Sequence, residues 1–288
     1  MEAKHSTVTV LAAVAPIVWG TTYLVTTELL PPGHPMTAAV LRAVPAGLLL
    51  IALTRGRPRQ WGRLVLLAVL NIGAFFPLLF VAAYRLPGGL AAVVGAGQPF
   101  IVALAAWWLL RQHTPRWQLV WAGVAVLGVL LTLTTGTLNV DPLGLLAAAL
   151  GTTSMALGVT LTRAWGPTAG LSGLASTGWQ LLLGGLLIAP LIPLLDRGPF
   201  VLTTGAVLGY AWLSVIGGAL AYGLWFHAAR TLPATSTALL GPLSPVTAAV
   251  LGWLVLGEAL SPVQTLGFSL ALVAVVLGQL VPAGRRLH

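Results

Sequence analysis

The sequence predicts an all-α polytopic membrane protein, with ten transmembrane helices in two inverted five-helix repeats around a central cavity. Three observations predict this fold class. Hydrophobic residues make up 58% of the chain and charged residues 7%, against roughly 25% charged residues in a typical soluble domain. The apolar residues fall into runs of about twenty, the length that crosses a bilayer as a helix. One long apolar segment also occurs twice.

The first half divides into five runs, and each boundary is marked by charged, Gly or Pro residues. The first run contains Ala13-Val14-Ala15, which resembles a signal-peptide cleavage site. Because apolar sequence continues beyond it, we predict a spanning helix instead. A Pro-Pro-Gly turn, an arginine-rich loop and the loop 111–116 separate later runs. The predicted spans are 8–27, 36–54, 64–84, 86–110 and 117–135.

The second half repeats this organisation after a polar connection through Asn139 and Asp141. Arg163, Asp196 and Arg230 mark the following boundaries. The predicted spans are 143–162, 171–195, 205–229, 232–256 and 263–281. We therefore expect the two repeats to occupy residues 1–138 and 139–288.

The distribution of basic residues predicts orientation. If the amino terminus is cytoplasmic, only Arg85 and Arg197 fall in outer loops, and the inner side receives Lys4, Arg55, Arg57, Arg59, Arg63, Arg111, Arg116, Arg163, Arg230, Arg285 and Arg286. This is the positive-inside pattern, and it predicts an inner-membrane protein with both termini cytoplasmic. The net charge of +9 does not indicate nucleic-acid binding, because the cations are not clustered on a soluble domain.

The duplicated segment is LPGGLAAVVGAGQPFIVALAAWWLL at 86–110 and LPATSTALLGPLSPVTAAVLGWLVL at 232–256. Pro99 and Pro245 lie 146 positions apart, as do the glycines four residues before them, Gly95 and Gly241. A proline inside a helix cannot bond the carbonyl four residues back. We therefore expect two kinked helices, each with a freed glycine carbonyl facing a polar cavity. Since each half has five spans, the second half must be inverted relative to the first.

These motifs resemble a known family. Trp19-Gly20, Arg42, the Pro-x7-Gly-x3-Pro run in both halves, and Gly257-Glu258 are similar to the EamA-type transporters of the drug/metabolite transporter superfamily. The resemblance implies ten helices in two inverted halves, with a cavity lined by helices one to four and six to nine. It also implies export of small metabolites, often amino acids. One departure is that Arg111-Gln112 stands where the second half has Gly257-Glu258.

Polar and aromatic residues near the middle of the spans are the candidate substrate ligands. They are Gln98, Ser244, Asn71, Trp19, Tyr23, Phe76, Thr153, Gln180, Tyr222 and Trp225. Arg42 is the basic residue placed well inside a span, and it is a candidate partner for a substrate carboxylate or a gate. The alternatives are interhelical hydrogen bonds for the polar residues and snorkelling of Arg42 to the outer surface.

Absences in the sequence narrow the mechanism. No Asp or Glu lies inside a predicted span, so the usual carboxylate for proton or sodium coupling is missing. There is no phosphate-binding loop, no cysteine, no metal-ligand cluster and no nucleophile beside a base, so we expect no ATP use, cofactor, metal or enzymatic activity. The sequence predicts a carrier that exports amino acids, aromatic ones favoured, as a monomer or weak homodimer in the bilayer. Efflux of hydrophobic drugs or toxins and a non-transporting membrane scaffold are the alternatives.

Overall fold

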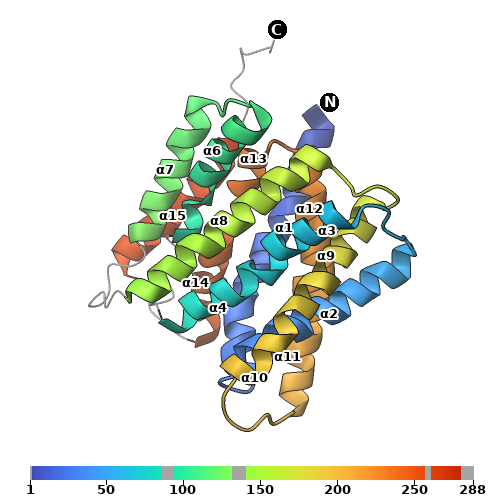
Figure 1. Ribbon diagram of the computed structural model, residues 1–288. Coiled ribbons are helices and arrows are strands. Elements are labelled where there is room, and N and C mark those ends of the chain that lie inside the picture. The colour runs from blue at the N-terminus through green and yellow to red at the C-terminus, as the bar shows by residue number, and fades with distance from the viewer. Residues whose placement is uncertain (1, 86–93, 132–140, 257–260, 280–288) are drawn as a thin grey trace.

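A computed structural model describes residues 2–85, 94–131, 141–256 and 261–279, and these residues form helices joined by short loops (Figure 1). Among them are six helices long and apolar enough to cross a membrane: Thr7–Thr26, Pro35–Thr54, Trp61–Ala82, Pro142–Trp165, Gly173–Leu195 and Thr204–Thr231. Shorter apolar helices cover Val94–Leu110, Arg116–Leu131 and Pro262–Gly278. The all-helical class is confirmed.

The described helices of the first half begin and end within a few residues of the predicted spans, except that α1 starts earlier and α6 starts well after the predicted position 86. The elements are α1 (Glu2–Leu29), α2 (Pro35–Thr54), α3 (Trp61–Ala68), the π-helix η1 (Val69–Gly73), α4 (Phe75–Arg85), α6 (Gln98–Leu110) and α7 (Arg116–Leu131). The sequence did not predict η1, which lies inside the third span. A π-turn inside an α-helix is a common feature of functional sites.

The second half contains a π-helix at the corresponding place. Its elements are α8 (Pro142–Trp165), α9 (Gly173–Ile188), η2 (Ala189–Leu191), α10 (Ile192–Leu195), α11 (Thr204–Ser214), the π-helix η3 (Val215–Leu220), α12 (Ala221–Thr231), α13 (Ala234–Ala238), α14 (Leu243–Leu256) and α15 (Pro262–Gln279). Val69 and Val215, which begin the two π-helices, lie 146 positions apart, the same offset that relates the duplicated segments.

The duplicated segments are broken helices rather than kinked ones. A turn at Gly97 precedes α6, whose first turn contains Pro99, and a turn over 239–242 separates α13 from α14. A proline in the first helical turn removes no intrahelical hydrogen bond, because the N–H there has no intrahelical partner. The prediction of a free Gly241 carbonyl is wrong, since this oxygen accepts from the Ser244 N–H at 3.0 Å. Residues 86–93, including Pro87, lie outside the described residues.

The two halves meet along seams where glycines allow close backbone approach. In the α2–α9 seam, a Cβ on Gly47 would lie 2.5 Å from the Leu182 nitrogen and 2.7 Å from the Gly178 oxygen. In the α7–α15 seam, a Cβ on Gly128 would lie 2.6 Å from the Gly267 oxygen. Figure 1 shows these two seams on opposite sides of the bundle. Small residues are the usual means of packing helices tightly in a membrane, where no hydrophobic effect drives association.

Contacts at both ends of the bundle also join the halves. At one end the Arg59 N–H donates to the Ala169 carbonyl at 3.1 Å, and Trp179 Nε1 donates to the Gly56 carbonyl at 3.0 Å. We call this the basic end, because the loops and helix ends there carry Arg55, Arg57, Arg59, Arg63, Arg163 and Arg230. At the opposite end the Arg197 N–H donates to the Gly33 carbonyl at 2.8 Å.

Asp196 makes the strongest link at the opposite end. Its carboxylate accepts the Met36 N–H at 2.8 Å, the Thr37 N–H at 2.9 Å and the Thr37 hydroxyl at 2.6 Å. It thereby caps α2, which has no side-chain cap of its own, from the other half of the chain. Asp141, Ser172 and Thr203 cap α8, α9 and α11 locally.

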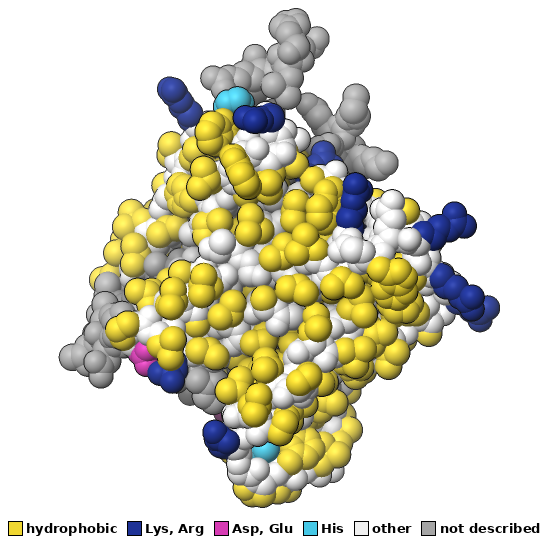
Figure 2. All heavy atoms as spheres, in the orientation of Figure 1, with side chains coloured by type: hydrophobic (Ala, Val, Ile, Leu, Met, Phe, Trp, Pro, Cys, Tyr) yellow, Lys and Arg dark blue, Asp and Glu magenta, His cyan; other side chains and the backbone are white. Residues whose placement is uncertain are grey.

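The face shown in Figure 2 is covered by hydrophobic side chains, and the charged side chains lie at its margins. Many large hydrophobic side chains lie on the surface, and three of them, Leu104, Trp108 and Leu254, are 63–67% exposed. A surface of this kind is stable only against lipid.

Candidate functional site

A buried cluster of rings and one guanidinium occupies the junction of α1, α2, α4, η3 and α12. We call Trp19, Arg42, Phe76, Tyr222 and Trp225 the central cluster. The Trp19 ring centroid lies 4.8 Å from that of Tyr222 and 5.2 Å from that of Trp225, and the Phe76 and Tyr222 centroids are 5.9 Å apart. Phe76, Tyr222 and Trp225 are each at most 2% exposed. The structure thus brings together five residues that the sequence predicted separately.

Arg42 points into this cluster. Its Cζ lies 5.5 Å from the Phe76 ring centroid and 5.9 Å from that of Tyr222, distances at which cation–π attraction operates. Nη2 donates to the Gly217 carbonyl at 3.2 Å, and Nη1 lies 3.5 Å from the Thr22 hydroxyl. The residue is 5% exposed, so it does not snorkel to the surface.

The Gly217 carbonyl is the backbone acceptor at the centre of this arrangement, and the sequence analysis missed it. It belongs to η3 and accepts from Trp19 Nε1 at 3.0 Å as well as from Arg42. A π-turn shifts the usual backbone pairing, which is how such segments present carbonyls to side chains. The only sequence signal was the Gly217-Gly218 pair inside an apolar run.

The other π-helix carries a second buried polar group, the amide cluster of Asn71, Gln180, Thr162 and Ser176. Asn71 Nδ2 donates to Gln180 Oε1 at 2.9 Å and lies 3.4 Å from the Thr162 hydroxyl. Gln180 Nε2 lies 3.4 Å from the Ser176 hydroxyl. All four residues are 0% exposed.

The two clusters occupy corresponding places in the repeat. Gly217 lies 146 positions after Asn71, the offset of the duplicated segments, and Gln180 lies 138 positions after Arg42, the offset between Gly47 and Gly185. The Arg42–Gly217 contact therefore corresponds under the repeat to the Gln180–Asn71 contact, and both contacts join the two halves. In both cases a long polar side chain of the second or seventh span reaches a π-helix.

The remaining candidate residues are placed less centrally. Gln98 begins α6 and is half-buried, and its Nε2 is buried without a hydrogen-bond partner among the described residues. Ser244 lies in the first turn of α14, with its carbonyl 2.6 Å from where a Cβ on Gly20 would be. Thr153 donates back to the Ala149 carbonyl at 2.8 Å. The Tyr23 side chain lies outside the described residues.

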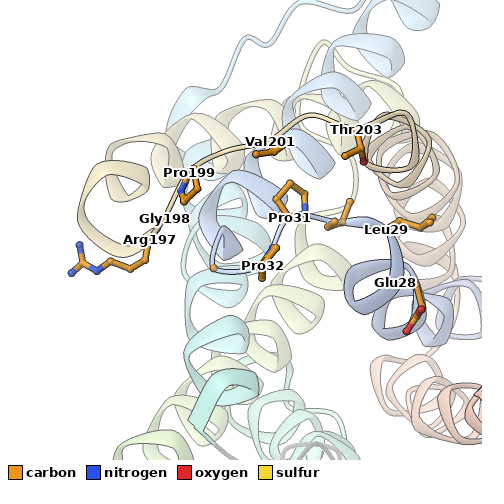
Figure 3. A pocket seen from close by; sticks show the side chains of 11 residues that line it. Glu28, Leu29, Pro31, Pro32, Arg197, Gly198, Pro199, Val201 and Thr203 are labelled. Atoms are coloured by element: carbon orange, nitrogen blue, oxygen red, sulfur yellow. The ribbon is translucent and has the colours of Figure 1, made fainter.

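The side chains expected to line an open central cavity are instead packed against one another. The two clusters fill the space at the centre of the bundle with rings, amides and a guanidinium. A cleft of about 660 Å³ lies at the opposite end, between residues 28–33 and 197–203, and none of the central cluster lines it (Figure 3). The residue types at a midplane site can be predicted from sequence, but whether they enclose solvent depends on how the halves are tilted.

The described residues include no group of three His, Cys, Asp or Glu side chains that could hold a metal ion. The ion pairs of Arg85 with Asp141 and of His34 with Asp196 lie away from both clusters. The sites are therefore built from rings, amides, hydroxyls and cationic nitrogen, which suits an organic solute with an anionic or polar group.

Comparison with known proteins identifies the family. The model of the EamA-like transporter family matches the chain twice, at residues 7–134 and 142–278. Protein PecM of Dickeya dadantii is 44% identical over 92% of this chain and 90% of its own length. The uncharacterized inner membrane transporter YedA of Escherichia coli K12 is 27% identical, over 91% of this chain and 87% of its own.

A chloroplastic WAT1-related protein of Arabidopsis thaliana is 30% identical over 90% of this chain and 66% of its own. A solved crystal structure superposes with a TM-score of 0.82 over 94% of this chain and 96% of its own, at 19% identity, and so shares the fold. The chain therefore belongs to the EamA-like transporter family and is a multi-pass membrane transporter of small molecules rather than an enzyme.

Proposed function

We propose that the chain is an inner-membrane carrier that exports amino acids, preferentially aromatic ones, by alternating access without ATP. The observation that carries this proposal is the burial of Arg42 against the rings of Phe76 and Tyr222. A guanidinium binds a carboxylate with two parallel hydrogen bonds, and rings stack on an aromatic side chain. Arg42 would thus hold the carboxylate of the solute, while the central cluster accommodates its ring.

We further propose that the halves are inverted repeats of five spans and that both termini are cytoplasmic. The packing of the helices supports this arrangement. When each helix of a packed pair is replaced by its counterpart in the other half, the resulting pair is also packed. Packing of α4 on α8 corresponds to packing of α12 on α1, and packing of α6 on α8 corresponds to packing of α14 on α1. The pairs α2–α9 and α7–α15 correspond to themselves. Inverted repeats of this kind place a substrate site near the membrane midplane.

In this view the packed centre belongs to a conformation in which the two halves are closed on each other. Tilting of one half against the other would separate the rings, which come from α1 and α4 in one half and α12 in the other. Since no span carries an acidic residue, we expect exchange or facilitated export driven by the solute gradient.

Flux measurement in liposomes tests the proposal. Purified protein should accelerate equilibration of radiolabelled phenylalanine and tryptophan over protein-free liposomes, with no imposed ion gradient and with a smaller effect on glycine. Arg57→Gln, which removes an exposed arginine of the basic end, is the matched control and should retain this flux. Equal rates with and without protein across an amino-acid panel would refute the proposal.

Export of uncharged hydrophobic toxins is the second candidate, because the central cluster contains four rings and a single charged group. The two candidates differ in what Arg42 does. If unlabelled benzamide competes with radiolabelled phenylalanine flux as strongly as unlabelled phenylalanine does, the toxin exporter is favoured.

A further inference from the structure

A second arginine lies on the same face of α12 as the rings of the central cluster. Tyr222, Phe226 and Arg230 are spaced four residues apart, so they line one side of the helix. The Tyr222 and Phe226 centroids are 5.7 Å apart, and Arg230 Cζ lies 5.9 Å from the Phe226 centroid. With Arg42 at 5.9 Å from Tyr222, these residues form a continuous series of guanidinium, ring, ring and guanidinium, which we call the α12 ladder.

The surroundings of Arg230 leave part of its hydrogen-bonding capacity unused. Nη2 donates to the Thr177 hydroxyl at 3.2 Å, while Nε is buried and has no hydrogen-bond partner among the described residues. A Cβ on Gly173 would lie 3.5 Å from Nη1, so Gly173 packs beside the guanidinium without crowding it. Arg163 donates to the Arg230 carbonyl, which brings a second guanidinium to the same place.

Arg85, a cation at a helix end in the other half, is paired with a carboxylate, and Arg230 is not. Arg85 is the last residue of α4 and Arg230 is the last but one of α12, and Arg85 Nη1 donates to Asp141 Oδ2 at 3.0 Å. No carboxylate among the described residues pairs with Arg230 or Arg163. A partly buried guanidinium with a free Nε is satisfied best by an oxyanion, which accepts from Nε and Nη2 together.

We propose that Arg230 and Thr177 form a second carboxylate-binding station at the basic end, from which an aromatic solute passes along the α12 ladder to Arg42. The solute carboxylate would accept from Arg230 Nε and Nη2, and its ring would stack on Phe226. This assignment rests on the proposed transport of aromatic amino acids, although the binding it requires can be measured without any flux.

Binding of small probes to the purified full-length protein provides the first test. Benzoate should raise the thermal unfolding temperature at lower concentrations than benzamide, which has the same ring but no charge. Arg230→Gln should weaken the apparent affinity for benzoate about tenfold, the loss expected for a charge-assisted hydrogen bond. The response to benzamide should not change. Arg230→Lys should restore part of the benzoate response, and Arg57→Gln should leave it unchanged.

Three outcomes of this test would overturn the station. They are an absence of preference for benzoate over benzamide in the wild type, an unaltered benzoate response in Arg230→Gln, and equal stabilisation by inorganic phosphate, which would indicate a general anion site or a lipid headgroup site. Should Arg230→Gln fail to fold, Phe226→Leu keeps the charge and should weaken benzoate binding while leaving acetate binding unchanged. An unaltered benzoate affinity in Phe226→Leu would likewise reject the ladder.

Flux measurements then separate this inference from the proposed function. Arg230→Gln should raise the half-saturating phenylalanine concentration applied at the basic end about tenfold, and should leave that of phenylalanine amide unaltered. Wild-type flux with no such difference between the two solutes would remove the station and leave the carrier standing. Absence of any wild-type flux together with Arg230-dependent benzoate binding would refute the carrier and leave the station standing.

Discussion

At the residue scale, the central question is how a charge is held in the middle of an apolar bundle. Arg42 is 5% exposed, and it is held by a backbone carbonyl, a hydroxyl and two ring faces. A buried cation is costly unless its donors are satisfied, so such residues in membrane spans usually mark functional sites. The two terminal NH2 groups of the guanidinium contact Thr22 and Gly217 at the same time, which a lysine ammonium cannot do in the same geometry.

Two replacements of Arg42 should therefore separate the contribution of its positive charge to transport from that of its guanidinium geometry. We expect Arg42→Gln to reduce phenylalanine flux at least tenfold, because a charge-assisted hydrogen bond to the solute is lost. Arg42→Lys should retain a measurable part of it, since the charge remains. The measurement is initial tracer flux at matched protein density, and equal flux in Arg42→Gln and wild type would show that this arginine does not contact the solute.

The residue types of the site could be predicted from sequence, but their partners could not. Arg42, Trp19 and Tyr222 stand out because polar and aromatic groups are rare in the middle of apolar runs. The Gly217 carbonyl does not, since hydrophobic periodicity does not reveal a π-turn. Arg230 was read as a loop cation, because its place at a helix end gives no hint that Phe226 and Thr177 surround it.

At the element scale, the contact between α2 and α9 depends on the absence of side chains. A Cβ at Gly47 would collide with backbone atoms of Leu182 and Gly178, which cannot rotate away. Gly62, on α3, has nothing within 4 Å of the corresponding position. The two glycines therefore form a matched pair, one sterically required and one not.

Gly47→Ala should lower the free energy of unfolding by about 1–3 kcal/mol, the usual cost of overpacking a close contact. Gly62→Ala should be neutral or stabilise by up to about 1 kcal/mol through helix propensity. Thermal unfolding of both variants in the same detergent decides the matter. Equal stability of the two would mean that the α2–α9 seam is looser than described.

The start of α8 provides a pH-dependent element. The Gly144 N–H, the Arg85 guanidinium and the Leu143 N–H stabilise the Asp141 carboxylate and lower its pKa from the ordinary value of 3.8. A depressed folded-state pKa adds stability above the unfolded pKa, and this is lost as the pH falls through the lower folded value. We expect Asp141→Asn to flatten the acid side of the unfolding temperature profile below about pH 4. An identical profile in variant and wild type would contradict this.

Helix ends and helix interiors were predicted with different success. Charged and Pro-Gly loops fix the ends, so α2 and α15 begin within a residue or two of the predicted positions. The interior of the duplicated segments was not predicted correctly. The proline at 99 or 245 was expected to kink a continuous helix, whereas it begins a new one after a turn. Sequence alone does not distinguish these cases, because both tolerate proline.

At the scale of the whole molecule, contacts between the halves at the two ends of the bundle fix the observed conformation. Asp196, whose side chain is 5% exposed, joins the end of α10 to the start of α2 through three short hydrogen bonds. Such a contact must weaken if the end of the bundle at which Asp196 lies opens. The sequence placed Asp196 in an outer loop but could not reveal that it caps a helix 160 positions away.

Asp196→Ala should lower the free energy of unfolding by about 1–3 kcal/mol through loss of the cap and its hydrogen bonds. It should also favour opening at that end. Because the chain has no cysteine, a single Val201→Cys substitution in the cleft provides a unique thiol for labelling. Labelling by a membrane-impermeant maleimide should be faster when Asp196 is replaced by alanine. Unchanged labelling would indicate that Asp196 stabilises α2 without controlling access.

The glycine seams have a mechanical consequence. Backbone meets backbone at Gly47 on one flank and at Gly128 on the other, and each seam joins one helix from either half. Two halves in close contact along two seams cannot slide freely past each other, but one half can rotate relative to the other about an axis that passes through both seams. In the proposed carrier, turning one way would part the rings toward one surface and press them together toward the other, so that Arg42 would be exposed to each side of the bilayer in turn.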